Sequence, residues 1–350
     1  MRARLKDVAA KAGVAPNTAS TILNRKPNSW ASEETRERVF KVAEELNYRP
    51  SRTALGLRTG SFKAIGLVVP DLHNPFYTAF SDCLERALRK FGYDLILEHS
   101  REDMDYQSKC LLSLLDRQID AVAYFVNDLD KHLDFLAKAK EADKTVVALT
   151  GPPPKGAPHL PFDSIQIDFT SGFIEAVDHL IELGHQRFAF LSALSKGQSA
   201  DGRPEMFNQL LQARGVTEEN NIYLTCSHEL EDMHRVFKEY LESQPPQRHP
   251  TALIALNDLA AIGAMRAAAD CGFSVPGDIS VVGVDDIPLG CFLPQRLSTI
   301  RQPIKDMAEA TAMMLLNRLR SSSESSTAVQ SKCFNTQFVC RETTSAVSSG

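Results

Sequence analysis

Apolar residues recur at helical spacing over the first 48 positions of the chain, where the pattern predicts three short helices over 5–12, 16–24 and 32–46. Gly13 ends the first helix in the manner of a left-handed cap, and Pro50 follows the third. The apolar side chains of each helix fall on one face and are expected to point inward. The chain therefore begins with a small all-helical head.

From residue 64 onward, short apolar runs alternate with amphipathic stretches, in two series separated by a Pro-rich loop over 151–161. Strands that are apolar throughout are typical of parallel sheets buried on both faces. The predicted strands are 64–69, 93–97, 121–125, 145–149, 165–167, 188–191, 222–225, 252–255, 280–284 and, after a Ser-rich loop over 321–332, 335–340. The fold class is therefore α/β, with two doubly wound lobes that face each other across a cleft.

A polar, basic segment with glycines, SRTALGLRTGSF, separates the helical part from the α/β part. It is too short and too poor in apolar residues to form a stable element, so it is predicted to be a linker. The predicted division is head 1–49, linker 50–62 and body 63–350. Within the body, the first lobe is expected to hold about 63–162 and 293–325, and the second about 163–292 and 326–345.

Charge is distributed unevenly between these parts. Residues 1–63 hold 13 Lys and Arg against 6 Asp and Glu, whereas the rest of the chain holds 26 against 38. A basic head on an acidic body suggests that the head meets a polyanion and the body does not. The alternative is that the basic head lies on the acidic body.

Composition excludes several classes of protein. Hydrophobic residues make up 43% of the 350 residues and charged residues 24%, as in soluble globular proteins. No window approaches 18 consecutive apolar residues, and the charged start over 1–11 lacks the apolar core of a signal peptide, so neither a membrane partner nor export is expected. The seven cysteines show no CxxC, which favours reduced thiols in a cytoplasmic protein.

Motifs of catalysis and cofactor binding are absent from the sequence. No GxxxxGK[ST] loop, no GxGxxG after a strand and no GxSxG elbow occurs. His228-Glu229 begins like a zinc-protease motif, but Asp232 stands where the second histidine is needed. We therefore expect no enzyme activity, no cofactor and no metal ion.

The segment KDVAAKAGVAPNTASTILN, residues 6–24, is the most informative part of the sequence. A helix, a short turn with Gly and a second short helix form a helix-turn-helix. The segment resembles the head of the LacI/GalR family of bacterial transcription regulators, whose pattern is D-V-A-x-x-A-G-V-S-x-x-T-V-S-x-x-L-N. Ala15 and Ala19 depart from it, because the family usually has Ser and Val there. Loss of the Ser removes a helix cap worth about 1 kcal/mol.

Further motifs similar to those of this family follow in the family's order along nearly the whole chain. They lie at 34–39, 46–50, 64–77, 183–185, 255–263, 281–286, 297–303 and 339–342. Several independent motifs in the right order argue against a chance resemblance. The resemblance implies an effector-controlled DNA-binding repressor, with a two-lobed body like that of periplasmic binding proteins.

By this resemblance, the second helix enters the major groove of double-stranded operator DNA. Pro16, Asn17 and Thr21 are then at its base-reading positions, where Asn17 can read adenine and Pro16 offers only apolar contact. The short polar side chains better placed for phosphates are Thr18, Ser20 and Asn24. Ordinary polarity of a helix surface is the alternative explanation for Thr18 and Ser20.

Residues 49–60 resemble the family's hinge, in which two short helices form on DNA and push a leucine into the minor groove at the dimer axis. Leu57 matches that leucine and Ala54 the small residue before it, whereas Leu55 stands where Arg is common. The alternative is that Leu55 and Leu57 pack on the body. A homodimer on a pseudo-palindromic operator is expected.

The resemblance also implies a small-molecule effector bound between the lobes. The matching positions are Phe76, Asp168, Arg203, Asn257 and Asp285. An Arg with Asp and Asn suits vicinal hydroxyls, and an aromatic face covers the C–H side of a sugar ring. A neutral sugar or polyol is therefore the first choice, and a purine or other anionic metabolite the second. Each of these side chains is alternatively a satisfied polar or apolar group at a strand end.

Two other classes of function fit the sequence less well. A solute-binding protein of the periplasmic type shares the two-lobed body, but it needs an export signal and has no DNA-binding head. An α/β enzyme needs a phosphate-binding loop or a nucleophile motif. The sequence therefore favours a repressor, although it names neither effector nor operator. It also leaves open whether the effector releases or promotes DNA binding, and whether the assembly is a dimer or a tetramer.

Overall fold

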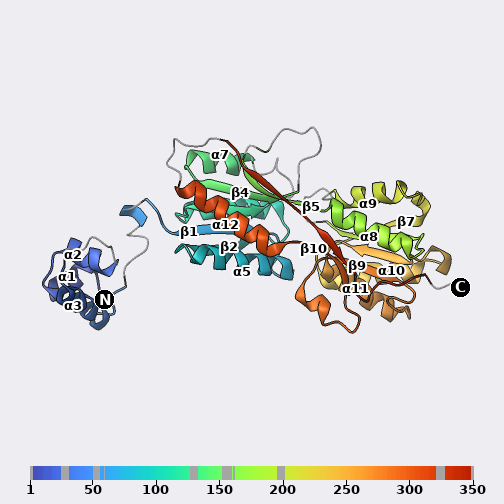
Figure 1. Cartoon of the computed structure of the whole chain (residues 1–350), viewed down its shortest axis with the longest axis horizontal. Helices are drawn as coiled ribbons and strands as arrows, with labels where there is room; N and C mark the ends of the chain where they lie inside the picture. The colour runs from blue at the N-terminus through green and yellow to red at the C-terminus, as the bar shows by residue number, and fades with distance from the viewer. Residues whose placement is uncertain are drawn as a thin grey trace. The chain divides into compact units, whose positions relative to one another are not determined.

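The computed structural model describes residues 3–24, 31–49, 56–58, 60–126, 133–151, 160, 162–194, 202–320 and 328–347. The chain forms two compact units, Met1–Lys63 and Ala64–Gly350, and each is described by itself (Figure 1). The first unit contains the helical head, and the second, the body, is α/β with two mainly parallel sheets. The fold class predicted from the sequence is confirmed.

Three helices form the head, namely α1 (Leu5–Ala12), α2 (Pro16–Leu23) and α3 (Glu33–Glu45). Their buried faces share one small core of Val8, Ala9, Ala12, Ala19, Ile22, Val39, Val42 and Ala43. Gly13 ends α1 with φ 65°, and its N–H donates to the carbonyl of Ala10. Ala15 precedes α2 without a side-chain cap, whereas the Oγ of Ser32 accepts from the N–H of Thr35 at the start of α3. The expected loss of a cap at Ala15 is confirmed.

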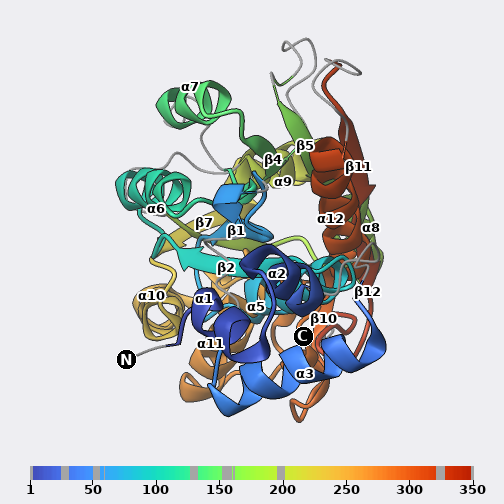
Figure 2. The same ribbon diagram turned by 90° about the vertical axis from the view of Figure 1, so that its left-hand side faces the viewer.

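The first lobe of the body is built on a six-stranded parallel sheet in the order β11-β5-β4-β3-β1-β2. The strands are β1 (Ala64–Val69), β2 (Asp94–His99), β3 (Ala121–Phe125), β4 (Thr145–Thr150), β5 (Asp163–Asp168) and β11 (Ser331–Asn335). Helices cover both faces, as Figure 2 shows, with α5 (Pro75–Arg89) and α12 (Ile304–Arg320) on one and α6 (Met104–Asp116) and α7 (Leu133–Glu141) on the other. Burial on both faces explains why the central strands are apolar throughout.

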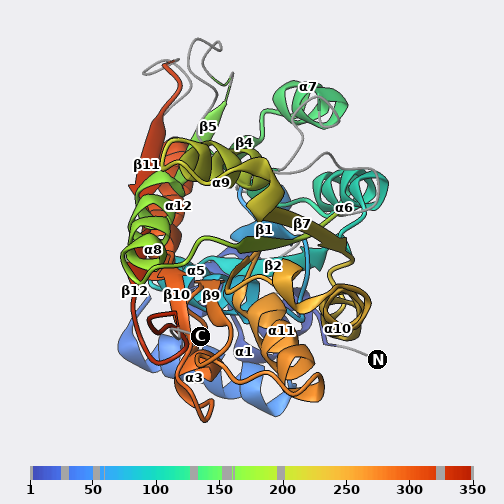
Figure 3. The ribbon, with the colours of Figure 1, turned by 90° about the vertical axis from the view of Figure 1, so that its right-hand side faces the viewer.

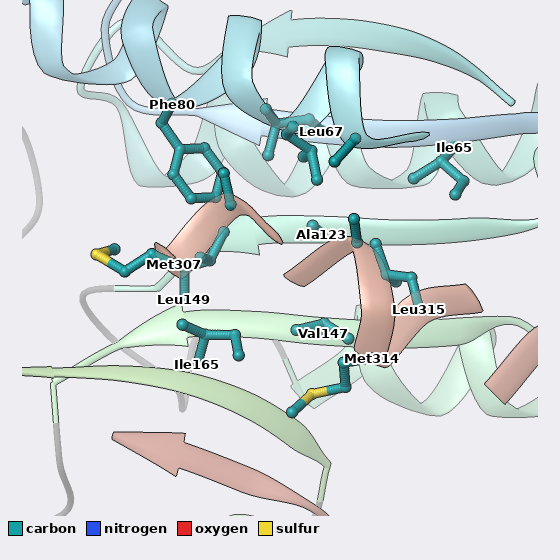
Figure 4. Close-up of a cluster of buried hydrophobic side chains, with 14 of the residues drawn as sticks. Ile65, Leu67, Phe80, Ala123, Val147, Leu149, Ile165, Met307, Met314 and Leu315 are labelled. Carbon is teal, nitrogen blue, oxygen red and sulfur yellow. The ribbon is translucent and has the colours of Figure 1, made fainter. Parts of the chain in front are cut away.

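The larger core of this lobe lies between its sheet and the helices α5 and α12. Figure 4 shows side chains of this core, among them Leu67, Phe80, Ala123, Leu149, Ile165, Met307 and Leu315. Helix α12 belongs to the first lobe although the second lobe precedes it in the sequence. Burial of a single Leu, Phe or Met contributes about 1.5–3 kcal/mol, so α12 is held firmly to strands far away in the chain.

The second lobe is built on a six-stranded sheet in the order β12-β10-β9-β8-β6-β7, in which only the pairing of β12 with β10 is antiparallel. The strands are β6 (Phe188–Ala193), β7 (Asn221–Cys226), β8 (Ala252–Ala255), β9 (Ser280–Asp285), β10 (Ser298–Arg301) and β12 (Gln337–Val339). Figure 3 shows α8 (Thr170–Glu182) and α9 (Arg203–Gln212) on one face and α10 (Leu230–Ser243) and α11 (Asp258–Asp270) on the other. Short 3₁₀ turns are η2 (Glu218–Asn220), η3 (Pro246–Arg248) and η4 (Pro288–Cys291).

The chain passes between the two sheets three times, and not at the expected places. It crosses after β5, between β10 and α12, and between β11 and β12. The lobe boundaries expected from the sequence are therefore corrected, because 163–168 and 331–335 join the first sheet and 298–301 joins the second. The last strand, expected over 335–340, is two strands in different sheets. Apolar runs look alike in both lobes, so the pattern alone does not show which sheet a strand joins.

The first and third crossings are hydrogen-bonded to each other. The N–H and the Oγ1 of Thr336 both donate to the carbonyl of Asp168, at 3.1 and 3.2 Å. The Oγ of Ser171 donates to the carbonyl of Thr336 at 2.6 Å. A Cβ on Gly172 would lie 2.7 Å from the Oγ1 of Thr336, so only glycine allows this close approach. Two of the three connections between the lobes are thus joined to each other by hydrogen bonds.

Candidate functional site

Helix α2 presents the candidate base-reading side chains of the head. Pro16 and Asn17, in its first turn, are exposed, and Thr18 and Thr21 are half-buried. The Oγ1 of Thr21 donates to the carbonyl of Asn17 at 2.9 Å, so that hydroxyl is engaged along the helix. Recognition helices contact base edges through their N-terminal residues, which is where Asn17 stands.

Ser20 lies differently from what the sequence led us to expect. It is buried, and its Oγ accepts from the Nδ2 of Asn24 and from the guanidinium of Arg58, each at 3.3 Å. The Nδ2 of Asn24 also donates to the carbonyl of Ser20 at 2.7 Å. Helix α2 is only eight residues long and packs against both α1 and α3, so its buried arc includes position 20. In the free head the hydroxyl of Ser20 is thus bonded within the protein, and its contact with a DNA phosphate stays a prediction.

The segment that follows the head contains a helical turn at residues 56–58, in which the N–H of Gly60 donates to the carbonyl of Gly56 at 2.8 Å. Leu57 on this turn is 68% exposed. A Cβ on Gly56 would lie 2.3 Å from the ring of Phe62, so the turn requires glycine there. The exposure of Leu57 suits a side chain that inserts into DNA, whereas Ala54 and Leu55 lie outside the described residues.

In the body, polar side chains gather around Asp285, the last residue of β9. Asp285 is 4% exposed and has φ 114°, a backbone conformation that residues other than glycine rarely adopt. Its Oδ2 accepts from the Nδ2 of Asn74 at 3.2 Å, and its Oδ1 accepts from the Nε2 of Gln302 at 2.6 Å. Burial raises the pKa of Asp285 to about 6, although these hydrogen bonds and the charge of Arg203 act to lower it.

Asn74 serves two elements at once. Its Oδ1 caps α5 by accepting from the N–H of Phe76 at 2.9 Å, and this bond fixes which end of the amide faces Asp285. Its own N–H donates to the Oδ2 of Asp71 at 3.0 Å. The start of α5 in the first lobe is thereby joined to the end of β9 in the second.

A second buried carboxylate lies close to Asp285. Asp258, the first residue of α11, accepts from the Oγ1 of Thr299 at 2.5 Å and from the N–H of Ile287 at 2.7 Å. Gly283 passes so near that a Cβ there would lie 2.1 Å from the Oδ1 of Asp258. Burial, and then the charge of Asp285, raise the pKa of Asp258 well above its usual value. Two neighbouring acidic groups make this region unfavourable for an anion.

Arg203 provides the cation of the site. It is the first residue of α9, its guanidinium lies 5.0 Å from the ring centroid of Phe169, and its NH1 donates to the carbonyl of Leu256 at 2.9 Å. The side chain is thus held by residues that end β5 and β8 rather than by its own helix. The positive charge of Arg203 acts to lower the pKa of Asp285.

Asp168 and Asn257 are next in sequence to the residues that hold Arg203, with Asp168 at the end of β5 and Asn257 at the N-cap of α11. The Oδ1 of Asp168 accepts from the N–H of Thr170 at 2.8 Å, and the Oδ1 of Asn257 accepts from the N–H of Ala260 at 2.8 Å. The structure thus brings Asp168, Asn257 and Arg203 together, but one oxygen of each of the first two already accepts from a backbone N–H.

Two adjacent aromatic residues, Phe76 and Tyr77, lie in the first turn of α5. Phe76 is 4% exposed and packs in the core of the first lobe, with its ring centroid 5.9 Å from that of Phe125. Tyr77 is half-buried. Burial raises the pKa of its hydroxyl well above the usual value, and the charges of Asp285 and Arg203 act on it in opposite directions. Tyr77 is therefore a second candidate for the aromatic residue of the site, and the role of Phe76 stays a prediction.

A second pair of side chains reaches between the lobes. The Oε1 of Glu102, which follows β2, lies 3.7 Å from the Nδ1 of His228, which follows β7. Arg101 and Glu102 have φ values of 56° and 53°, and such strained backbone is kept where the surroundings fix it. Between the lobes, the described side chains offer hydrogen-bond donors, acceptors and an aromatic ring, an arrangement suited to binding a small molecule.

Both the head and the body are similar to known proteins. Residues 4–51 match the model of "Bacterial regulatory proteins, lacI family", and residues 177–344 match "Periplasmic binding protein-like domain". The chain is 29% identical to the HTH-type transcriptional repressor PurR of Photobacterium profundum over 320 residues, 91% of this chain and 92% of that protein. The lac repressor dimer bound to operator and the anti-inducer ONPF has a TM-score of 0.84 at 25% identity, covering 99% of this chain and all of that one.

The chain combines a LacI-family helix-turn-helix domain with a periplasmic-binding-like domain. A transcriptional regulator CelR–cellobiose complex is also similar, at 25% identity and a TM-score of 0.67, covering 98% of this chain and 100% of that one. These domains and relatives place this chain among DNA-binding transcriptional regulators with an effector-binding body, rather than among enzymes. The resemblance seen in the sequence is confirmed.

No helix in the described part of the chain has the length and apolarity that a bilayer crossing requires. Across the same residues, no group of three or more His, Cys, Asp or Glu side chains is arranged to hold a metal ion.

Sequence reasoning missed three residues that the structure places around Asp285. They are Asn74, Tyr77 and Gln302. All three lie inside motifs quoted for the LacI/GalR resemblance, at 64–77 and 297–303. A polar residue beside proline at the start of a helix, as in Asn74-Pro75 and Gln302-Pro303, was the available signal.

Proposed function

We propose that this LacI-family regulator is a repressor that binds a pseudo-palindromic operator as a homodimer and is controlled by a neutral sugar or polyol bound between its lobes. The observation that carries the proposal is the grouping of Asp285, Arg203 and Tyr77. It combines a carboxylate acceptor, a forked donor and an aromatic ring. This combination favours a ring-shaped molecule with adjacent hydroxyls.

Charge favours a sugar over a purine or another anionic metabolite. Asp285 and Asp258 are buried near each other, and Arg203 already donates to a backbone carbonyl. Buried carboxylates disfavour a ligand that brings further negative charge. The CelR–cellobiose complex supports the same choice. A purine is the second candidate, because relatives over most of the chain are repressors named PurR.

Thermal unfolding of the full chain in the presence of sugars, polyols and purines tests the effector class. A ligand at 100 times its Kd stabilises the folded state by about 2.7 kcal/mol, which raises the Tm of a domain of this size by several degrees. The matched control is Asp285→Asn, which keeps the shape of the side chain and removes its charge. We expect a neutral sugar to raise the Tm of the wild type and not of this variant. A shift by purines alone would favour the second candidate, and no shift would refute the effector proposal.

On DNA, we propose that Pro16, Asn17 and Thr21 face bases, that Thr18 and Asn24 lie nearest the phosphates, and that Leu57 enters the minor groove. The exposure of Pro16, Asn17 and Leu57 supports this arrangement. A regulator that acts on chromosomal DNA works in the cytoplasm, which agrees with the reduced cysteines expected from the sequence.

An exposed apolar turn in the second lobe supports the homodimer. Phe292 is 84% exposed and Leu289, on the same turn, is about half exposed. Exposed apolar side chains that cluster in this way mark contact surfaces. Sedimentation equilibrium should show a dimer for the wild type and a weaker dimer for Phe292→Asp. Unchanged association of that variant would exclude this turn from the interface.

A further inference from the structure

Gln302 lies in the second crossing between the lobes, between β10 and α12, and it is 6% exposed. Its Nε2 donates to the Oδ1 of Asp285 at 2.6 Å. An ionised carboxylate only accepts hydrogen bonds, so this contact fixes the amide with its oxygen turned away from Asp285. Among the described residues, that oxygen, the buried Oε1, accepts no hydrogen bond.

A buried amide oxygen without a donor is unusual, because nearly all buried polar atoms in native proteins are hydrogen-bonded. The side chain is also held where it is. Pro303 restricts the backbone of Gln302, and the carbonyl of Gln302 accepts from the N–H of Ile304 at 2.9 Å. Asp285 is itself fixed by Asn74 of the first lobe. The acceptor is therefore kept in place at a cost to the unliganded protein, which points to a donor that arrives from outside the chain.

We infer that Gln302 binds the effector, and that its Oε1 accepts a hydrogen bond from a hydroxyl or N–H group of that molecule. The inference rests on the proposed function, since it assumes an effector between the lobes, and it deepens that proposal by naming a specificity residue. An acceptor at this point favours a ligand with a donor there. It disfavours one that presents an ether, carboxylate or phosphate oxygen.

The position of Gln302 also determines what such a ligand connects. Gln302 is part of a crossing between the lobes, and its partner Asp285 is hydrogen-bonded to Asn74 of the first lobe. A ligand that donates to the Oε1 of Gln302 therefore adds to a hydrogen-bonded set that already joins both lobes. A hydrogen bond to this one atom therefore links the ligand to both lobes.

Three full-length proteins separate the two roles of the side chain. Gln302→Lys keeps a donor for Asp285 and removes the acceptor, Gln302→Met removes both, and the wild type has both. Each protein is titrated by calorimetry with ribose, cellobiose, adenine and hypoxanthine. The ligand that binds the wild type best is then compared with analogues that each lack one hydroxyl or have one N–H methylated.

We expect Gln302→Lys to bind that ligand about tenfold more weakly or worse, while its Tm without ligand stays close to that of the wild type. One analogue should lose affinity for the wild type and bind Gln302→Met as well as the parent ligand does. The group that this analogue lacks is then the group that donates to the Oε1 of Gln302. A merely structural role of Gln302 does not produce this pairing of results.

Each other result is decisive as well. If Gln302→Lys binds the ligand like the wild type, or if no analogue shows the pairing, Gln302 is not an effector-binding residue and the sugar proposal stands by itself. If the best ligand is a purine that depends on Gln302, the inference stands and the sugar proposal fails. If none of the four compounds binds the wild type, both are overturned.

Discussion

The two sites of this chain use polar side chains in opposite ways. On α2 the candidate reading residues Pro16 and Asn17 are exposed, and the core beneath the helix is made of small apolar side chains. In the body, Asp285, Asp258 and Gln302 are buried, and most of their polar atoms are bonded to neighbouring residues. DNA is bound by exposed side chains on a surface, whereas a small molecule must be surrounded by side chains and separated from water.

Charge shows the same contrast. The first 63 residues hold 13 basic against 6 acidic side chains, and the other 287 hold 26 against 38. Long-range attraction to phosphates needs only an excess of charge, which salt screens. Recognition in the body depends on single hydrogen bonds at fixed distances. We therefore expect salt to act mainly on the head, and single-atom changes mainly on the body.

Salt should have the largest effect. A dimer whose heads neutralise about 6–10 phosphates is expected to lose about a thousandfold in DNA affinity between 50 and 200 mM salt. Affinity of the effector for the body should change little over this range. Fluorescence anisotropy for DNA and calorimetry for the ligand measure the two. DNA binding that is indifferent to salt would contradict the role of the basic head.

Leu57→Ala tests the exposed turn at 56–58. The change keeps helix propensity and removes only the side chain that enters the minor groove, so specific DNA binding is expected to weaken by about 2–3 kcal/mol, as for a lost wedge. Binding to random sequence should hardly change, because phosphate contacts are retained. Leu55→Ala is the matched control. Equal affinity of the wild type and Leu57→Ala for a selected operator would refute the wedge.

The pH dependence of stability should distinguish the body from the head, because His185 lies in the body. Burial lowers the pKa of His185 to about 4, from about 6.5 in the unfolded chain. The unfolded chain then binds the extra proton between these values, so this group costs stability as pH falls from 6.5 to 4, by up to about 3 kcal/mol. Asp285, whose pKa burial raises to about 6, acts in the opposite direction. The head contains no histidine.

Denaturant unfolding of the wild type and His185→Gln at several pH values isolates this contribution. The variant loses the hydrogen bonds of His185 to Thr251 and Ser280 at every pH, so it should be less stable at pH 7. The difference in unfolding free energy should then narrow as the pH falls toward 4. A difference that stays constant would show that His185 titrates normally in the folded body.

Ser20→Ala should have the smallest effect. Because Ser20 is buried and accepts from Asn24 and Arg58, we expect the head to lose about 1 kcal/mol of stability. Thr18→Ala, at a half-buried position of the same helix, is the control and should leave stability nearly unchanged. If Ser20→Ala instead leaves stability intact and weakens DNA binding more than Thr18→Ala does, Ser20 contacts phosphate after all.

Local sequence patterns predict the helices and strands well, but they do not show which strands pair or which side chains contact one another. Helices and strands follow from local spacing, and strand ends such as Asp285 and Asn257 can be found because the strands are apolar runs that stop. The sheet joined by β5, β10 or β11 depends on contacts far along the chain, which a local pattern does not contain. The burial of Ser20 could not be predicted, because α1 and α3 cover more of α2 than its apolar residues indicate.

The effector site shows the same limit at the level of single side chains. Phe76 and Tyr77 are adjacent aromatics and both rings pack against Phe125, so their spacing in the sequence does not show that Phe76 is the more buried of the two. Gln302 looks like an ordinary polar residue before a proline. Its unsatisfied oxygen becomes visible only when the bond to Asp285 fixes the amide.

The central claim is that a small molecule in the acidic body controls DNA binding by the basic head. The direct test is the affinity of the full-length protein for an operator selected from random sequence, measured with and without the sugar that stabilises it best. We expect the sugar to change operator affinity about tenfold or more, a coupling free energy of about 1.4 kcal/mol, and to leave random-sequence affinity unchanged. Operator affinity that is the same with and without a bound sugar would contradict the account.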